Sequence, residues 1–214
     1  METTKITAKV DEKLLIEFNN KLESCFIKRD AFLNHVINIE IDCLEKEMKG
    51  LKQTSAARQY ISGKLKKRRT KTINIVMNKK TVEKLNLIIK KSNMVRDAFI
   101  NRIILFLSAS DDVLKFLDLP QRLNEVPNNF AFDMDINTSI LSGFKSMMDD
   151  PFLYLRHSIK LQFDIEIYRH VLPEQLHGMS CYLDNSCIPH TREYKEKVKE
   201  KSNFIASLSD EFEK

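Results

Sequence analysis

The feature that most constrains the fold of this chain is an internal repeat with an offset of 67 residues. Residues 5–37 align with residues 72–104 without a gap, and the agreement is strongest between KRDAFLNHVI (28–37) and VRDAFINRII (95–104). The identical pairs include Ile6/Ile73, Lys13/Lys80, Arg29/Arg96, Asp30/Asp97, Ala31/Ala98, Phe32/Phe99, Asn34/Asn101 and Ile37/Ile104. A repeat of this kind indicates two copies of one structural unit.

Each copy begins with a short segment in which every second residue is apolar. The segments are KITAKV in the first copy and TINIVM in the second. A period of two is typical of a strand with one buried face. The residues predicted on that face are Ile6, Ala8, Val10, Ile73, Ile75 and Met77.

Two segments with helical spacing follow each strand. The first has apolar residues at Leu14, Leu15, Phe18 and Leu22, matched by Val82, Leu85 and Ile89. The second has them at Phe32, Leu33, Val36 and Ile37, matched by Phe99, Ile100, Ile103 and Ile104. Polar residues near Ser24 and Ser92 separate the two segments, so each copy predicts a strand and two amphipathic helices.

A short strand is unstable alone, because its backbone donors and acceptors need a neighbouring strand. We therefore expect the two strands to pair antiparallel as a ribbon, with the four helices packed on its apolar face. The side chains predicted on the opposite, outward face are Lys5, Thr7, Lys9, Thr72, Asn74 and Val76.

The motifs RDAFLNHVI and RDAFINRII resemble the second-helix signature of the ribbon-helix-helix DNA-binding family, the fold of Arc- and MetJ-like repressors. KITAKV resembles the DNA-contacting strand of that family, and the resemblance covers residues 5 to about 107. Family members usually form homodimers, so two copies in one chain resemble a fused pseudo-dimer. The family often has Ser or Thr at the start of the second helix, where this chain has Lys28 and Val95. Backbone amides, but no hydroxyl cap, are therefore expected there.

The resemblance implies that the ribbon enters the DNA major groove, which is wide enough for two strands. The strand period selects the same six outward residues for base contacts. The expected contacts are Lys5 and Lys9 with guanine, Asn74 with adenine, Thr7 and Thr72 with either kind of hydrogen-bonding group, and Val76 with a thymine methyl group. Because the two strands differ, one chain is expected to prefer a non-palindromic site; two chains on adjacent sites would restore symmetry.

Charge is distributed unevenly along the chain. Residues 1–110 carry 23 Lys and Arg against 12 Asp and Glu, whereas residues 111–214 carry 12 against 18, so the halves have net charges of +11 and −6. Residues 49–71 hold nine basic residues and no acidic one. This distribution suggests a polyanion-binding module and a module with another partner, although two ordinary solvated surfaces would look the same.

The predicted phosphate contacts come from the helix starts and the basic linker. They are Lys28, Arg29, Arg96, Lys66, Lys67, Arg68 and Arg69. The alternatives are ion pairs of Arg29 and Arg96 with their neighbouring Asp residues, and for the linker a solvated connection or a nuclear-localisation signal.

The sequence thus predicts a mostly α fold with one short antiparallel β-ribbon: a tandem ribbon-helix-helix pseudo-dimer followed by a mainly helical C-terminal domain. The expected divisions are residues 1–48 for the first copy, 49–71 for the basic linker, 72–109 for the second copy and 110–214 for a partner-binding or regulatory region.

The C-terminal region is less clearly patterned. A short helix is expected at DDVLKFLDLP, capped by Asp111 or Asp112 and ending at Pro120, with a loop at Pro127, Asn128 and Asn129. A second helix is expected from Asp149 or Asp150 to about Leu172, where the alternation of Leu161, Phe163, Ile165 and Ile167 leaves a strand as the alternative. REYKEKVKEKSNFIASLSDEF predicts a charged amphipathic helix or a frayed tail.

No cofactor and no enzymatic activity are expected, because no phosphate loop, zinc-protease helix or nucleophile elbow occurs. A weak candidate metal site consists of His177, Cys181, Cys187 and His190, whose spacing matches no common zinc module. The four cysteines are too scattered for a secreted disulfide framework, and neither a signal peptide nor a membrane-spanning run occurs, so a cytoplasmic protein is expected.

These observations together favour a double-stranded-DNA-binding transcriptional regulator, a bacterial or plasmid repressor whose acidic half binds a protein partner. Two alternatives remain open. One is an antitoxin-type regulator whose C-terminal half binds a toxin. The other is a DNA-binding accessory protein for conjugation or phage defence.

Overall fold

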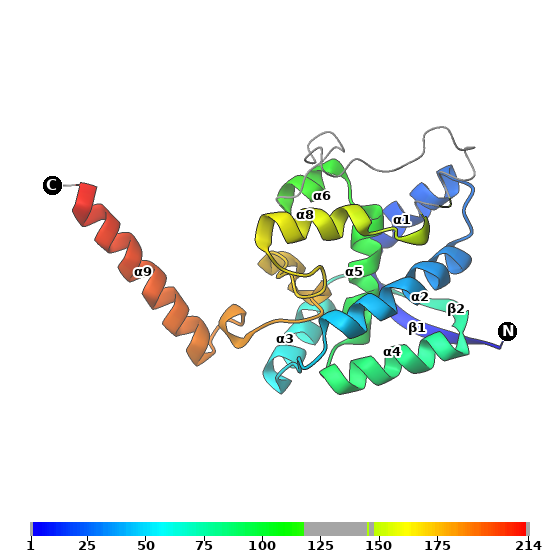
Figure 1. The fold of residues 1–214 in the computed structure, drawn as a ribbon, viewed down its shortest axis with the longest axis horizontal. Coiled ribbons are helices and arrows are strands. Elements are labelled where there is room, and N and C mark those ends of the chain that lie inside the picture. Colours follow the sequence, from blue (N-terminus) through cyan, green and yellow to red (C-terminus); the bar gives the residue numbers. More distant parts are fainter. Residues whose placement is uncertain (1, 118–144, 146–147, 213–214) are drawn as a thin grey trace.

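The computed structural model, which describes residues 2–117, 145 and 148–212, contains a two-stranded antiparallel ribbon that lies between α2 (Arg29–Glu47) and α4 (Lys79–Ser92) in the view of Figure 1. Strand β1 (Thr3–Asp11) pairs with β2 (Thr70–Asn78), and Thr7 lies opposite Asn74. Thr7 and Asn74 are equivalent residues of the repeat, so the register is symmetric about this pair. The expected antiparallel pairing of the two strands is confirmed.

The alternating pattern of the strands separates a buried face from an exposed one, as predicted. All six apolar residues of the inner face are at most 6% exposed, whereas the residues between them face solvent. Burial of this face against helices supplies the hydrophobic free energy that a two-stranded ribbon lacks on its own.

Two helices follow each strand and cover the inner face of the ribbon. In the first copy these are α1 (Glu12–Ser24) and α2 (Arg29–Glu47), and in the second α4 (Lys79–Ser92) and α5 (Arg96–Ser108). The predicted apolar positions are buried, except that Ile89 and Phe32 are only half-buried and Ile88 takes the buried position on α4.

The two copies are alike in backbone detail as well as in sequence. Equivalent residues Phe26 and Asn93, in the turns between the paired helices, both adopt left-handed conformations with φ of 59° and 53°. The backbone N–H groups of Glu12 and Lys79 are also equivalent, and at 3.0 Å each donates to the carbonyl of the residue that precedes the opposite strand, Arg69 and Glu2 respectively. The duplication seen in the sequence therefore corresponds to a local two-fold relation across the ribbon.

The basic linker contains a helix, α3 (Ser55–Lys66), which the sequence analysis did not predict. The Thr54 hydroxyl accepts a hydrogen bond from the Ala57 N–H at 3.1 Å and caps the helix. Ala57, Ile61 and Leu65 are buried, and their spacing of four residues gives the helix one apolar side. This apolar spacing was the sequence signal for a helix in the linker, and it was overlooked because the linker was interpreted from its charge alone.

The C-terminal region contributes shorter elements to the same body. These are α6 (Asp111–Phe116), α8 (Leu153–Phe163), η3 (Glu174–Met179) and η4 (Asn185–Cys187). Residues from α8, from η3 and from the segment between them belong to the same hydrophobic cluster as the ribbon and its helices. The mostly helical class with one short antiparallel ribbon is therefore confirmed.

Several predicted boundaries in this region were wrong. The Ser110 hydroxyl, rather than an aspartate, caps α6. The helix α8 ends at Phe163, because Asp164 adopts a left-handed conformation with φ of 49°. Residues 164–173 therefore form neither the predicted helix nor the alternative strand. The predictions at Pro120, Pro127, Asn128 and Asn129 lie outside the described residues.

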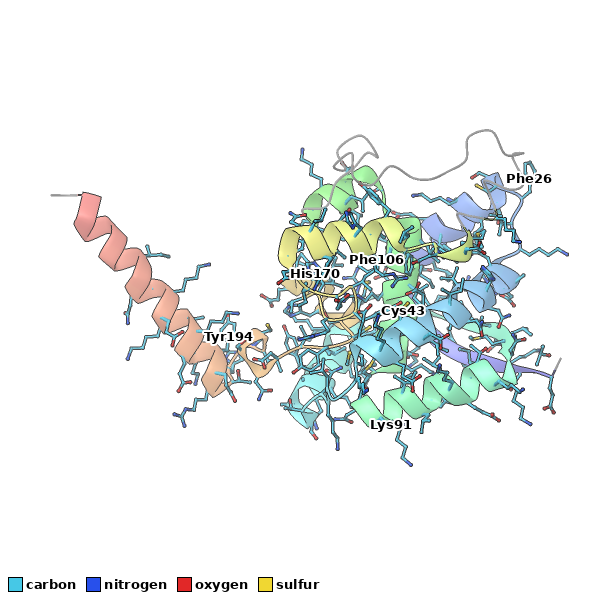
Figure 2. The ribbon with its side chains drawn as sticks, viewed as in Figure 1. Phe26, Cys43, Lys91, Phe106, His170 and Tyr194 are labelled. Atoms are coloured by element: carbon cyan, nitrogen blue, oxygen red, sulfur yellow. The ribbon has the colours of Figure 1, made fainter. Side chains whose placement is uncertain are left out.

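The last helix, α9 (Arg192–Phe212), confirms the helical expectation for the C-terminal segment. It extends away from the rest of the molecule (Figure 1), and Tyr194 lies near its start (Figure 2). Across the described ranges, no helix combines the length and the apolar character that a membrane span requires.

The C-terminal region packs unequally on the two copies. Arg102 of α5 is fully buried and donates hydrogen bonds to the backbone carbonyls of Ile167 and His170. Its equivalent on α2, His35, is exposed. As a result α5 is buried on nearly all sides, whereas α2 keeps a solvent-facing side.

A second buried polar cluster joins α2 to the C-terminal region. The Glu40 carboxylate, fully buried, accepts two hydrogen bonds from Arg156 of α8 and one from the Tyr168 hydroxyl. Glu47 accepts the Tyr168 backbone N–H at 2.7 Å, and burial raises the pKa of this carboxyl to about 7. The charge of Glu40 is thus compensated inside the core, as a buried carboxylate requires.

Candidate nucleic-acid interface

The outer face of the ribbon presents side chains from both copies. All six residues predicted for base contacts are exposed there, and they pair across the strands as Lys5 with Val76, Thr7 with Asn74 and Lys9 with Thr72. Neighbouring strands lie about 4.8 Å apart, so these side chains form two adjacent rows. The face carries two ammonium groups, an amide, two hydroxyls and one apolar side chain.

The symmetric centre of this face holds a side-chain hydrogen bond. The Thr7 hydroxyl donates to Oδ1 of Asn74 at 3.0 Å. This bond fixes the orientation of the Asn74 amide and does not use its Nδ2 hydrogens. Since Asn recognises adenine through both a donor and an acceptor, a base would have to displace or share the Thr7 contact.

Two equivalent arginines, Arg29 and Arg96, donate hydrogen bonds to the backbone of the central pair of the ribbon. Arg29 donates to the Asn74 carbonyl at 3.4 Å, and Arg96 donates to the Thr7 carbonyl at 2.7 Å. Arg29 also pairs with Asp30 at 2.9 Å, which is the alternative that the sequence left open for it. The two guanidinium groups therefore lie beside the central pair of the ribbon, and some of their N–H donors are already hydrogen-bonded within the protein.

The starts of α2 and α5 have no side-chain cap. Lys28 and Val95 occupy the N-cap positions and neither side chain accepts a hydrogen bond from the first turn. Lys28 is exposed. The free amides and the helix dipole make each start electropositive, which favours an anion such as a phosphate group.

The basic linker does not present all of its charge to solvent. Arg68 donates to the Asp11 carboxylate at 2.5 Å and to the Gln175 carbonyl at 2.9 Å, and only 29% of its side chain is exposed. Arg69 pairs with Glu12 at 2.5 Å. The sequence count found no acid within the linker, but these acids lie outside it, Asp11 at the end of β1 and Glu12 at the start of α1.

Lys66 and Lys67 differ from the two arginines. Both are exposed, and in the described part of the chain neither takes part in an ion pair or a side-chain hydrogen bond. The linker cations predicted to contact phosphate are therefore of two kinds: Lys66 and Lys67 have no acidic partner among the described residues, whereas Arg68 and Arg69 are paired with Asp11 and Glu12.

Sequence reasoning missed the residues that hold the ribbon in place. Asn101 accepts the Asp11 N–H at 2.8 Å and donates to the Lys9 carbonyl at 2.8 Å. Its equivalent, Asn34, accepts the Asn78 N–H at 3.0 Å. The identity of these two asparagines within the repeat was a usable signal, since a polar residue kept inside an apolar helix pattern needs a partner.

The weak candidate metal site is not assembled. In the regions that the structure describes, no three His, Cys, Asp or Glu side chains are placed to hold a metal ion. His177 instead lies against Tyr60, with 3.3 Å between Nδ1 and the hydroxyl oxygen, and burial lowers the pKa of its imidazole. Burial raises the pKa of the Cys181 thiol to about 12, so this thiol stays protonated at neutral pH. Cys187 is only partly buried, and His190 is exposed.

Comparison with known proteins gives no further guide to this interface. No protein-family model, no curated protein and no solved structure matches the chain. The interpretation of the ribbon therefore depends on its own chemistry and symmetry.

Proposed function

We propose that this chain binds double-stranded DNA sequence-specifically, as a fused ribbon-helix-helix pseudo-dimer, by inserting the ribbon into the major groove. The observation that carries this proposal is the pairing of two repeat copies about Thr7 and Asn74, with six side chains facing solvent. The major groove is about 12 Å wide and admits a two-stranded ribbon. The resemblance of the second-helix motifs to the ribbon-helix-helix family supports the same function.

The chemistry of the face supports base contacts within such a groove. Lys5 and Lys9 offer donors to guanine, Asn74 offers its amide to adenine, and Val76 offers an apolar contact to a thymine methyl group. Lys28, Lys66 and Lys67 would neutralise phosphates at the flanks. Since the two strands carry different residues, the preferred site within one chain's footprint is non-palindromic.

The fused arrangement has a consequence for affinity. Both strands of the ribbon belong to one chain, so the DNA-binding unit does not dissociate on dilution as a homodimer would. This property suits a cytoplasmic regulator present at few copies, and we propose transcriptional repression as its role.

A protein partner is proposed for the C-terminal region. α9 extends from the body and exposes Val198 and Ile205, which are 47% and 54% accessible. The start of α9 contacts η4, where the Asn185 amide donates to the Glu193 carboxylate at 3.3 Å. Exposed apolar side chains on an amphipathic helix favour association with another protein.

Selection of bound fragments from random duplex DNA, using the full chain, tests the proposed function. We expect one enriched non-palindromic sequence and a steep fall in affinity with salt. Asn74→Ala should weaken binding to that sequence by about 1–3 kcal/mol and leave binding to unrelated DNA unchanged. Asn86→Ala, a matched substitution of an exposed asparagine on α4, should change neither. Absence of any enriched sequence, or equal effects of the two substitutions, would refute the proposal.

A further inference from the structure

The helix α3 carries a polar stripe along its exposed side. The residues of this stripe line one shallow hollow and are Ser55, Arg58, Gln59, Ser62, Gly63 and Lys66. Their spacing of three and four residues places them on one helix face. Two cations, two hydroxyls and an amide are the side-chain groups that most often contact DNA phosphates, and the small residues Ser62 and Gly63 leave room for a phosphate backbone to approach.

The opposite side of α3 is fixed to the body of the protein. Ile61 packs with Ala98 and Leu183, and a Cβ atom added to Gly178 would lie 2.9 Å from the Leu65 backbone nitrogen, so η3 and α3 are in close contact. The stripe is therefore held on a rigid helix rather than on a flexible linker, which lowers the entropic cost of binding along it.

The stripe also keeps its positive charge. Arg58 donates to Oδ1 of Asn93 at 2.9 Å, a neutral partner, and Lys66 forms no ion pair with any residue that the structure describes. Arg68 and Arg69, by contrast, are paired with acids at the end of the ribbon. On α3, Lys64 is paired with Glu174 at 2.7 Å, so the charge that the helix offers at its exposed face is that of Arg58 and Lys66.

This feature occurs at only one end of the ribbon. α3 leads into β2 and lies at the end of the ribbon away from the N-terminus, where Asp11 pairs with Thr70 (Figure 1). At the other end of the ribbon, Lys79 forms an ion pair with Glu2 at 3.1 Å. Among the described residues, no helix at that end corresponds to α3. The local two-fold relation of the ribbon is therefore broken by one basic helix.

We propose that the α3 stripe binds the phosphate backbone of duplex DNA beyond one end of the ribbon, so that the protected site is longer on that side. This inference rests on the proposed function of the ribbon. A helix of 12 residues is about 18 Å long, which corresponds to about five base pairs of B-DNA. The ribbon selects the sequence, and α3 adds affinity that does not depend on the sequence.

Hydroxyl-radical footprinting of the full chain on its selected duplex tests the inference. The expected footprint extends about five base pairs farther from the ribbon's contact site on one side than on the other. The double variant Arg58→Ala with Lys66→Ala should shorten that side, weaken binding to selected and unrelated DNA roughly thirtyfold, and reduce the salt dependence by about two counterions.

Two further variants control this experiment. Lys115→Ala with Lys197→Ala removes the same charge from exposed lysines on α6 and α9 and should leave the footprint unchanged. Arg58→Lys with Lys66→Arg retains the charge and should retain the extended footprint. A symmetric wild-type footprint, or equal losses for the two alanine double variants, would overturn the inference while leaving sequence selection and the Asn74→Ala effect intact. Failure of all DNA selection would overturn the proposed function as well.

Discussion

The two equivalent asparagines beneath the ribbon allow one substitution to be compared in two environments of the same protein. Asn101 is fully buried; it accepts from the Asp11 N–H and donates to the carbonyls of Lys9 at 2.8 Å and Asp97 at 2.6 Å. Asn34 is half-buried and makes one such bond, to the Asn78 N–H. Each bond contributes about 1 kcal/mol net, and more where its loss leaves a buried backbone group unpaired.

We therefore expect Asn101→Ala to lower the free energy of unfolding by about 3 kcal/mol and Asn34→Ala by about 1 kcal/mol. Equilibrium urea unfolding followed by circular dichroism measures both, and an unchanged m-value would show that the unfolded states are comparable. Asn101→Asp, which keeps an acceptor but removes both donors, should cost at least as much as the alanine variant. Equal losses at Asn34 and Asn101 would refute the reasoning that burial and hydrogen-bond number set the difference.

The remaining predictions concern the packing of the C-terminal region. Arg102→Ala should lower the free energy of unfolding by about 3–5 kcal/mol in urea titrations, whereas Arg102→Met should cost less, because two guanidinium nitrogens of the buried side chain already lack partners in the described structure. A larger loss for Met than for Ala would contradict this. Burial raises the pKa of Glu47 to about 7 and lowers that of His170 to about 4, so between pH 4.5 and 6.5 the first group makes stability fall with rising pH and the second makes it rise. The wild-type stability should be nearly flat across this window, while Glu47→Gln should gain roughly 1–2 kcal/mol from pH 4.5 to 6.5 after allowance for partial exposure; a falling profile would exclude the assigned role of His170. Gly178→Ala should destabilise by about 1–3 kcal/mol through its clash with the α3 backbone, whereas Gly63→Ala, with open space around its Cβ position, should stabilise by up to about 1 kcal/mol in thermal unfolding. Similar melting temperatures for the two glycine variants would argue against the close contact.

The repeat made the ribbon predictable from the sequence. Period-two alternation in KITAKV and TINIVM identified the buried Ile6 and Ile75, and the need of each strand for a partner then required the two copies to pair. The six outward residues followed from the same alternation, so the composition of the candidate interface depended on local pattern alone.

The remaining features depend on contacts between distant segments, which local pattern does not encode. Arg68 was predicted to face phosphate, yet its partner Asp11 lies 57 positions away and meets it only when the ribbon forms. Likewise α8 stops at Phe163 because the following residues wrap α5, where Arg102 holds their carbonyls. Propensity favoured a longer helix, and tertiary hydrogen bonds decided otherwise.

Because the two copies lie in one chain, their amino-acid sequences can differ at equivalent positions. In a homodimer every substitution occurs twice, so a residue that recruits an additional segment would recruit two of them. Here position 102 is a buried arginine that donates to two carbonyls of the C-terminal region, while its counterpart at position 35 is an exposed histidine whose Nε2 lies 2.9 Å from the Met148 carbonyl oxygen. The ribbon therefore carries one C-terminal region rather than two, an asymmetry that is possible because both copies lie in one chain and differ in sequence.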